Sequence, residues 1–125
     1  MLAGSTVLIV EAEYLVALDL QNSLQASGAG KVILARNPSD ALEKADEWMD
    51  ATLAIVELEA DRPQLRAFAD LITRAGISVI GLTTDERLAE RWPDRPILLK
   101  PGLDQHLAEA IRRALDGARA RQLAR

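Results

Sequence analysis

Short runs of aliphatic and β-branched residues alternate with longer stretches of helical periodicity along the whole chain. The apolar runs occupy residues 6–10, 31–35, 53–56, 77–82 and 97–99. Such nearly continuous apolar runs are typical of strands buried on both faces, as in parallel sheets. Five strands that alternate with helices predict an α/β fold, a (βα)5 doubly wound parallel sheet with helices on both faces.

The segments between the strands carry helix signals at their ends. Helices are expected over residues 13–28, 38–49, 63–76, 85–92 and from 104 onward. Asn37 and Pro38 are typical of a helix start, and Gly28 and Gly76 of helix ends. Gly117 is expected to end or fray the last helix. Four leucines of the first helix are expected to face the core: Leu15, Leu18, Leu20 and Leu24.

Length and composition favour a single domain over residues 1–125, with a core over about 5–116 and a helical or frayed basic tail over 117–125. The absence of cysteine and a single histidine argue against thiol chemistry and imidazole metal sites. A net charge of −4 does not favour a nucleic-acid partner. No apolar run is long enough to span a membrane and no export signal is recognisable, so a cytoplasmic location is expected.

Charged and hydroxyl side chains follow the predicted strands at their carboxyl ends. In a doubly wound sheet these ends meet at one edge, where ligands bind. The residues that this argument selects are Glu11, Ala12, Glu57, Glu59, Thr83, Lys100 and Pro101.

This order of residues resembles the receiver domain of bacterial two-component response regulators, over residues 7 to about 115. The resemblance implies a flavodoxin-like topology with strand order 2-1-3-4-5. It also implies a pocket in which paired acidic residues hold Mg²⁺, an aspartate accepts a phosphoryl group, and a Thr or Ser and a Lys-Pro pair contact that group. Glu11, Thr83, Lys100 and Pro101 match four of these positions.

Two positions depart from the pattern of the family. Ala12 stands where the second acidic residue and metal ligand would be, and Glu57 stands where the phosphoaccepting aspartate would be. Alanine offers Mg²⁺ no side-chain oxygen, and the extra methylene of Glu57 moves its carboxylate by about 1.5 Å. Phosphoryl transfer depends on positioning at this scale, so a degenerate site without Mg²⁺ or another cofactor is expected.

Glu59 could replace the missing carboxylate only if its strand continues, so Glu11, Glu57 and Glu59 are the one alternative set of metal ligands. Without a metal, Glu57 is predicted to pair with Lys100 and to place an oxygen within reach of Thr83, in imitation of a phosphoryl group. Ile97 occupies the switch position, where the family commonly has an aromatic side chain.

The first functional hypothesis is a pseudo-receiver, a non-enzymatic module of two-component signalling that binds protein partners. The expected partners are a sensor histidine kinase or a downstream output protein, and a second copy of this chain through the face of residues 85–92, 97–99 and the last helix. The alternative is an active phosphoacceptor in a His-Asp phosphorelay that uses Glu57 or a neighbouring carboxylate. A nucleotide-binding domain is disfavoured, because the turn after the first strand is acidic and lacks glycine.

Several residues also have a simpler interpretation. Glu11, Glu57 and Lys100, each taken alone, could be ordinary solvent-facing charges, and Thr83 could cap the fourth helix. Trp48 and Trp92 are expected to pack at the edge of the core, and His106 is expected to be exposed. The arginines of the last helix and tail are interpreted as a solvated surface.

Overall fold

The computed structural model of the protein describes residues 2–93, 95–100 and 103–123. The strands are β1 (Thr6–Val10), β2 (Lys31–Ala35), β3 (Leu53–Glu57), β4 (Ser78–Thr83) and β5 (Ile97–Leu99). The helices are α1 (Tyr14–Ala26), α2 (Pro38–Glu43), α3 (Ala45–Trp48), α4 (Pro63–Arg74), α5 (Glu86–Arg91) and α6 (Leu103–Leu123).

The strands form one parallel five-stranded sheet in the order β2-β1-β3-β4-β5. The predicted fold class and strand order are therefore confirmed. The residues of β3 and β4 are all buried, as their apolar sequences predicted. Burial on both faces explains why these strands show no alternation of polar and apolar residues.

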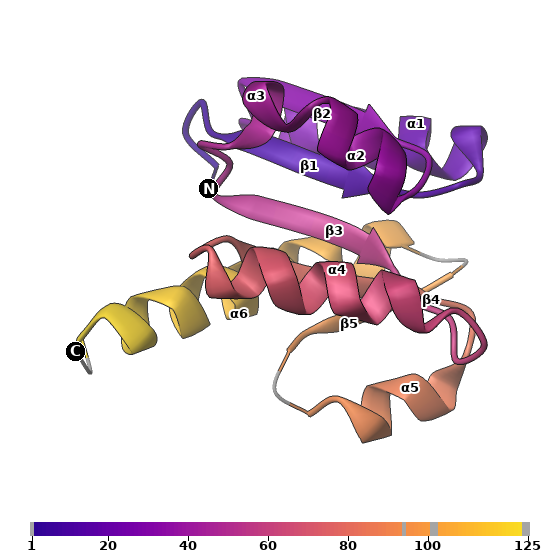
Figure 1. Cartoon of the computed structure of the whole chain (residues 1–125). Helices are drawn as coiled ribbons and strands as arrows, with labels where there is room; N and C mark the ends of the chain where they lie inside the picture. The colour runs from indigo at the N-terminus through magenta and orange to yellow at the C-terminus, as the bar shows by residue number, and fades with distance from the viewer. Residues whose placement is uncertain (1, 94, 101–102, 124–125) are drawn as a thin grey trace.

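Helices cover both faces of the sheet (Figure 1), and an apolar cluster lies on each face. Leu8 and Val10 of β1 join a cluster with residues of α2 to α5, whereas Val7 and Ile9 join a second cluster with residues of α1 and α6. Successive side chains of a strand point to opposite faces, so each central strand contributes to both layers. This arrangement leaves the ends of the strands free to form a site.

Local signals in the sequence begin and end most helices where expected. The Asn37 side chain accepts a hydrogen bond of 2.8 Å from the Asp40 backbone nitrogen at the start of α2. Gly28 follows α1 with a φ of 101°, and Gly76 follows α4 with a φ of 95°. These left-handed conformations favour glycine, so both residues end their helices as predicted.

Three expectations about the helices are wrong. The second helix is interrupted at Lys44, whose ammonium donates to the Leu34 carbonyl at 2.7 Å and links this turn to β2. Leu15 is 74% exposed, because α1 begins at the sheet edge and only its later turns cover β1. The last helix continues past Gly117 to Leu123, so Gly117 does not end it, whereas the expected alternative of a helical tail agrees with the structure. Helix propensity disfavours glycine by only about 1 kcal/mol, which neighbouring turns can offset.

The bounds of two strands differ from the prediction, by one residue at each of three ends. β3 includes Glu57, and β4 runs over Ser78–Thr83. Glu57 is paired with Leu82, and Thr83 with Leu99. Both polar residues therefore belong to the hydrogen-bonded sheet, which holds their backbones in place.

Both tryptophans pack in the core as predicted, each only 6% exposed. The Trp48 indole nitrogen donates to the Ala41 carbonyl at 2.7 Å, and its ring meets Phe68 edge to face at 6.0 Å. Trp92 lies against the Arg66 guanidinium at 4.5 Å from the ring centroid. His106 is exposed, also as predicted.

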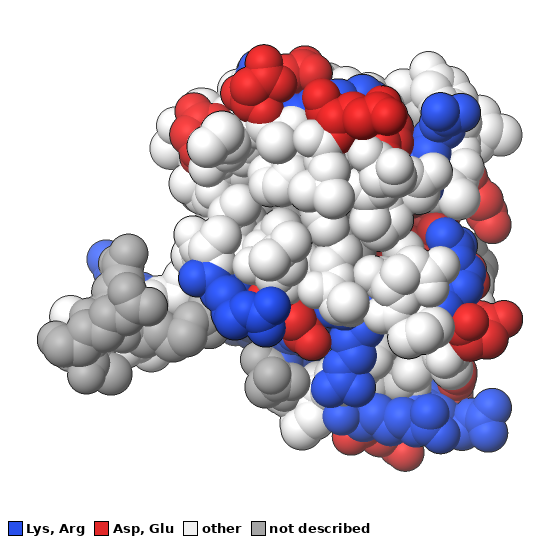
Figure 2. Space-filling view, in the orientation of Figure 1, with Lys and Arg blue, Asp and Glu red and all other residues white. Residues whose placement is uncertain are grey.

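On the surface shown in Figure 2, acidic side chains gather at the edge that carries α3 and β2. Basic side chains are more numerous over the half that carries α4 and α5, where acidic side chains lie among them. The net charge of −4 is therefore not spread evenly over this surface. In the part of the chain that the structure describes, no helix has the length and apolar character needed to cross a membrane.

Candidate functional site

The candidate site lies at the carboxyl ends of β1, β3, β4 and β5, where backbone hydrogen bonds continue beyond the strands. The Glu11 nitrogen donates to the Ala35 carbonyl at 2.9 Å, and the Lys100 nitrogen donates to the Thr83 carbonyl at 2.9 Å. Residues that follow β1 and β5 are thus held almost as firmly as residues inside them. This backbone support brings together side chains that are far apart in the sequence.

Lys100 lies between two buried carboxylates. Its ammonium is 2.9 Å from Glu11 Oε1 and 3.2 Å from Glu57 Oε2. The side chain of Lys100 is 9% exposed, that of Glu57 6%, and that of Glu11 is fully buried. The predicted pairing of Glu57 with Lys100 is present, and the shorter contact is with Glu11. With all three groups ionised, the cluster carries one net negative charge.

Backbone nitrogens of the loop after β1 support the same carboxylates. The Ala12 nitrogen donates to Glu57 Oε1 at 3.2 Å, and the Glu13 nitrogen donates to Glu11 Oε1 at 3.1 Å. The sequence analysis missed both donors, since backbone groups carry no signature in the sequence. The Ala12 nitrogen and the Lys100 ammonium together give Glu57 one partner on each carboxylate oxygen, which keeps its carboxylate in one orientation.

Burial and pairing change the pKa of two of these groups. Burial raises the pKa of Glu11 above its ordinary value of 4.5, and the hydrogen bonds from Lys100 and Glu13 only partly oppose this effect. For Lys100, burial acts to lower the pKa, but the hydrogen bond and charge of Glu11 and the charge of Glu57 together outweigh it. The pKa of Lys100 therefore lies above its ordinary value of 10.5.

Thr83 is buried at the same edge of the sheet, but it does not bind Glu57. Its hydroxyl accepts a hydrogen bond of 3.1 Å from the Asp85 nitrogen, and no hydrogen bond joins it to Glu57 among the described residues. Asp85, and not Thr83, caps α5, because its Oδ1 accepts from the Arg87 nitrogen at 2.9 Å. The predicted contact of Glu57 with Thr83 is thus not formed.

The carboxylates do not form a suitable set of ligands for Mg²⁺. Three of the four oxygens of Glu11 and Glu57 accept hydrogen bonds, and only Glu11 Oε2 is buried without a partner. The Lys100 ammonium occupies the space between the two carboxylates, whereas Mg²⁺ requires several oxygens in octahedral geometry. Over residues 2–93, 95–100 and 103–123, no three acidic or histidine side chains are placed to hold a metal ion.

Glu59 lies apart from this cluster. β3 ends at Glu57, so the strand that would have carried Glu59 to the same side does not continue. The Glu59 side chain is 40% exposed and 3.7 Å from Arg62 Nη1. The alternative ligand set of Glu11, Glu57 and Glu59 is therefore not assembled.

The remaining predicted site residues are Ile97 and Pro101. Ile97 is half-buried beside the core, and a Cβ added to Gly81 would lie 2.6 Å from its Cδ1. The missing side chain at Gly81 thus makes the space that Ile97 fills. Its role as a switch position stays a prediction. Pro101 lies outside the described residues.

Comparison with solved structures decides the fold family. A receiver protein from Sinorhizobium medicae is 19% identical, with a TM-score of 0.75, over 94% of this chain and 99% of that chain. This chain has the receiver fold. The chemotaxis protein CheY4 from Vibrio cholerae is 20% identical, with a TM-score of 0.73, over 90% of this chain and 100% of that chain. SdrG from Sphingomonas melonis is 27% identical, with a TM-score of 0.70, over 92% and 98%.

Comparisons with models of protein families and with curated proteins give no match. The receiver fold therefore rests on the three-dimensional structure. In this structure Glu11, Glu57, Thr83 and Lys100 lie at the carboxyl ends of the strands. The resemblance to receivers predicted a pocket at the same edge of the sheet.

The pKa of Glu11 leads to a prediction about stability. A carboxyl group with a raised folded-state pKa binds more protons in the folded than in the unfolded chain, so stability decreases as pH rises from 4.5 through that pKa. Glu11→Gln should remove this decrease, which amounts to at most about 1.4 kcal/mol per pH unit. Urea denaturation of wild type and variant between pH 4.5 and 7 measures the difference.

Glu59→Gln is the matched control, since it removes one exposed carboxylate outside the cluster and should keep the wild-type pH dependence. An equal pH dependence in wild type and Glu11→Gln would contradict the raised pKa. Lys100 acts in a different range. The contribution of Lys100 to the free energy of unfolding is fully present below pH 10.5 and is lost as pH rises through its folded-state pKa. It is therefore constant between pH 4.5 and 7, where wild type and Glu11→Gln are compared.

Proposed function

We propose that this chain is an atypical receiver of two-component signalling, a cytoplasmic and non-enzymatic module that binds protein partners without depending on phosphorylation. The receiver fold supports the general class. The position of the Lys100 ammonium between Glu11 and Glu57 is the observation that carries the proposal. In the family, as the resemblance implies, this lysine contacts the bound phosphoryl group.

A phosphoryl group would meet unfavourable charges in this pocket. It would have to take the Lys100 ammonium away from Glu57 Oε2 and would add negative charge beside two buried carboxylates. Repulsion between like charges is strong in a poorly solvated site when no metal compensates it. Ala12 supplies no side-chain oxygen for such a metal, so the resting arrangement with Lys100 is favoured.

Exposed apolar residues beside the pocket support a protein partner. Tyr14 is 66% exposed and Leu15 is 74% exposed at the start of α1, directly after the loop that carries Ala12 and Glu13. Neighbouring exposed apolar side chains are typical of protein interaction sites. A sensor histidine kinase or an output protein that covers this end of α1 would also contact the loop that donates to Glu57.

A homodimer through α5, β5 and α6 is the second proposed partnership. This face corresponds to the one expected from the sequence, and Leu99 of β5 is 38% exposed on it. Sedimentation at increasing protein concentration measures this association. A chain that stays monomeric at all concentrations would contradict the homodimer. The proposed partners would then be other proteins only.

The test of phosphorylation uses Mg²⁺ together with beryllofluoride or acetyl phosphate. The proton–nitrogen correlation spectrum of the wild-type chain should show no saturable change at Glu57, Thr83 or Lys100, and its mass should not increase by a phosphoryl group. A Mg²⁺-dependent saturable change at these residues would overturn the proposal and favour the alternative, an active phosphoacceptor. Spectra recorded with beryllofluoride alone provide the control for unspecific binding.

A further inference from the structure

The start of α1 has no side-chain cap of its own. Its N-cap residue, Glu13, forms no capping hydrogen bond with its side chain, and the first turn of α1 contains no acidic residue. The first backbone nitrogens of a helix have no partner within the helix, and a capping side chain is what usually binds them. Because α1 lacks this local support, the preceding loop has to fix the place where the helix begins.

Side-chain packing holds this loop only weakly. Ala12, Glu13 and Tyr14 are all exposed. A hollow of about 330 Å³ lies beside the loop, and its lining includes Ala12, Tyr14, Ala17 of α1 and Leu34 of β2. A side chain next to a hollow lacks neighbouring atoms on that side, so dispersion contacts contribute little to its position. The backbone hydrogen bonds of the loop are therefore what fixes it.

Two of these hydrogen bonds join the loop to the buried cluster of the candidate site. The Ala12 nitrogen donates to Glu57 Oε1 at 3.2 Å, and the Glu13 nitrogen donates to Glu11 Oε1 at 3.1 Å. Glu11 and Glu13 are two residues apart in the same segment, whereas Glu57 belongs to β3. Of the two bonds, only the one from Ala12 thus ties the loop to another strand. Its acceptor is a carboxylate, and hydrogen bonds to charged groups are the stronger ones in proteins.

The acceptor of this bond is itself held firmly. The backbone of Glu57 is paired with Leu82 in the sheet, and its side chain is only 6% exposed. Its second oxygen accepts from the Lys100 ammonium at 3.2 Å, and the same ammonium donates to Glu11 at 2.9 Å. The Glu57 carboxylate therefore cannot move away from the loop without breaking a buried ion pair.

We propose that Glu57 is a positioning residue for the exposed surface of Tyr14 and Leu15, and that it acts through the backbone nitrogen of Ala12. In this role the carboxylate holds the start of α1 in place without any covalent change. A change at Glu57 or Lys100 is then transmitted to Tyr14, which follows Ala12 by two residues and is 66% exposed. The inference rests on the proposed function for the partner that binds this surface, but the positioning itself is measured in the free chain.

Amide hydrogen exchange of the full chain with Glu57→Met tests the link. The variant keeps an unbranched side chain, removes both oxygens and leaves Lys100 paired with Glu11, so the buried charges are balanced and the chain should fold. The Ala12 amide should exchange at least about tenfold faster, because its charged acceptor is lost. The amide signals of Tyr14 and Leu15 should shift as well. Unchanged exchange at Ala12, or unchanged signals of the other two residues, would overturn the proposal.

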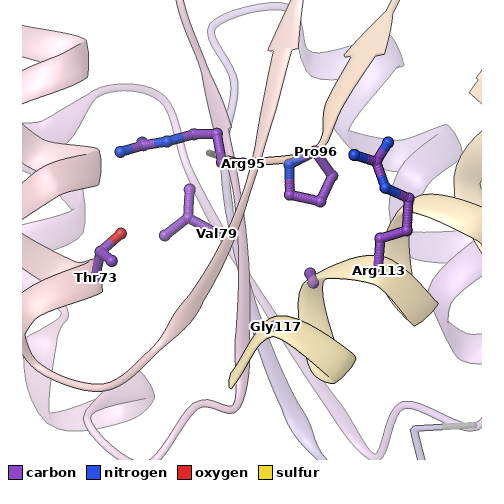
Figure 3. Close-up of a pocket in the computed structure, with 7 residues that line it drawn as sticks. Thr73, Val79, Arg95, Pro96, Arg113 and Gly117 are labelled. Atoms are coloured by element: carbon purple, nitrogen blue, oxygen red, sulfur yellow. The ribbon is translucent and has the colours of Figure 1, made fainter. Parts of the chain in front are cut away.

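Val79→Ala is the control for a general loss of stability. Val79 is buried near the start of β4, at the opposite end of the sheet from the candidate site. It lines a second cavity, of about 270 Å³, and Figure 3 shows it between Thr73 of α4 and Gly117 of α6. This variant removes buried methyl groups and lowers the stability of the chain, but the Ala12 amide should exchange as in wild type, because the loop opens locally. An equal increase in both variants would show exchange through global unfolding and would overturn the proposal.

A third variant separates the hydrogen bond from the shape of the side chain. The combination of Glu11→Gln, Glu57→Gln and Lys100→Met leaves an amide oxygen at position 57 that can accept from Ala12, and no ammonium competes for it. The Ala12 amide should then exchange more slowly than in Glu57→Met, and equally fast exchange would overturn the proposal. These rates are measured without Mg²⁺, phosphoryl donors or partners. A Mg²⁺-dependent response to beryllofluoride, which would overturn the proposed function, is therefore a separate result.

Discussion

The double variant Ala12→Asp/Glu57→Asp is expected to bind Mg²⁺ and to accept a phosphoryl group from acetyl phosphate. The change at Ala12 adds a carboxylate beside Glu11, and the change at Glu57 withdraws the second carboxylate from Lys100 by about 1.5 Å. The ammonium would then keep its contact with Glu11 and could turn its side toward residue 57 to a phosphoryl group. Because errors of about 1 Å in position can cost about a hundredfold in rate, phosphorylation should increase by at least about that factor.

The two single variants separate the causes. Glu57→Asp alone restores the length of the acceptor but not the missing oxygen, and Ala12→Asp alone restores the oxygen while Glu57 still holds Lys100. Each should remain far below the double variant in Mg²⁺ affinity and in the yield of phosphorylated protein, measured by titration and mass spectrometry. If the double variant binds no Mg²⁺, the pocket is not a degenerate receiver site.

Lys100→Met is expected to destabilise the chain by about 3 to 5 kcal/mol. The variant keeps the unbranched stem of the side chain up to the ε position but leaves the buried carboxylates of Glu11 and Glu57 without their shared ammonium. Removing one partner of a buried ion pair costs about this much. Domains of this size have a total stability of about 5 to 15 kcal/mol, so a large part would be lost. Urea denaturation at neutral pH measures the loss.

Two comparisons make this prediction specific. Lys31→Met removes an exposed lysine whose ammonium donates to the Glu47 carbonyl at 3.3 Å, and this change should cost under about 1 kcal/mol. Adding Glu11→Gln and Glu57→Gln to Lys100→Met should recover most of the lost stability, because no buried charge then lacks a partner. A triple variant as unstable as Lys100→Met would mean that packing of the lysine stem, and not its charge, is what the cluster requires.

The exposed start of α1 shows how the site and the fold are related. A helical pattern of leucines predicts one apolar face, and Leu20 and Leu24 are indeed buried, but Leu15 is exposed beside the pocket. Periodicity identifies the side of a helix that is apolar, not how far the sheet beneath it extends. The exposure of Leu15 next to Tyr14 became visible only in the three-dimensional structure, and it supports the interaction surface proposed here.

The sequence by itself determined the strands, their parallel arrangement and the ends of most helices. These features depend on local signals. Buried strands are apolar throughout, and Gly28, Gly76 and Asn37 end or begin helices that lie directly beside them in the sequence. It also determined which residue types follow each strand. From these, the pairing of Glu57 with Lys100 could be predicted, and this pairing is present.

The tertiary structure alone decided the contacts between residues far apart in the chain. Lys100 is 89 residues from Glu11 and 43 from Glu57, yet it binds both, and backbone nitrogens of the loop after β1 complete the cluster. The break between α2 and α3, where Lys44 donates to the Leu34 carbonyl of β2, likewise involves a neighbouring element. Such contacts depend on how the elements pack, which no short stretch of sequence encodes.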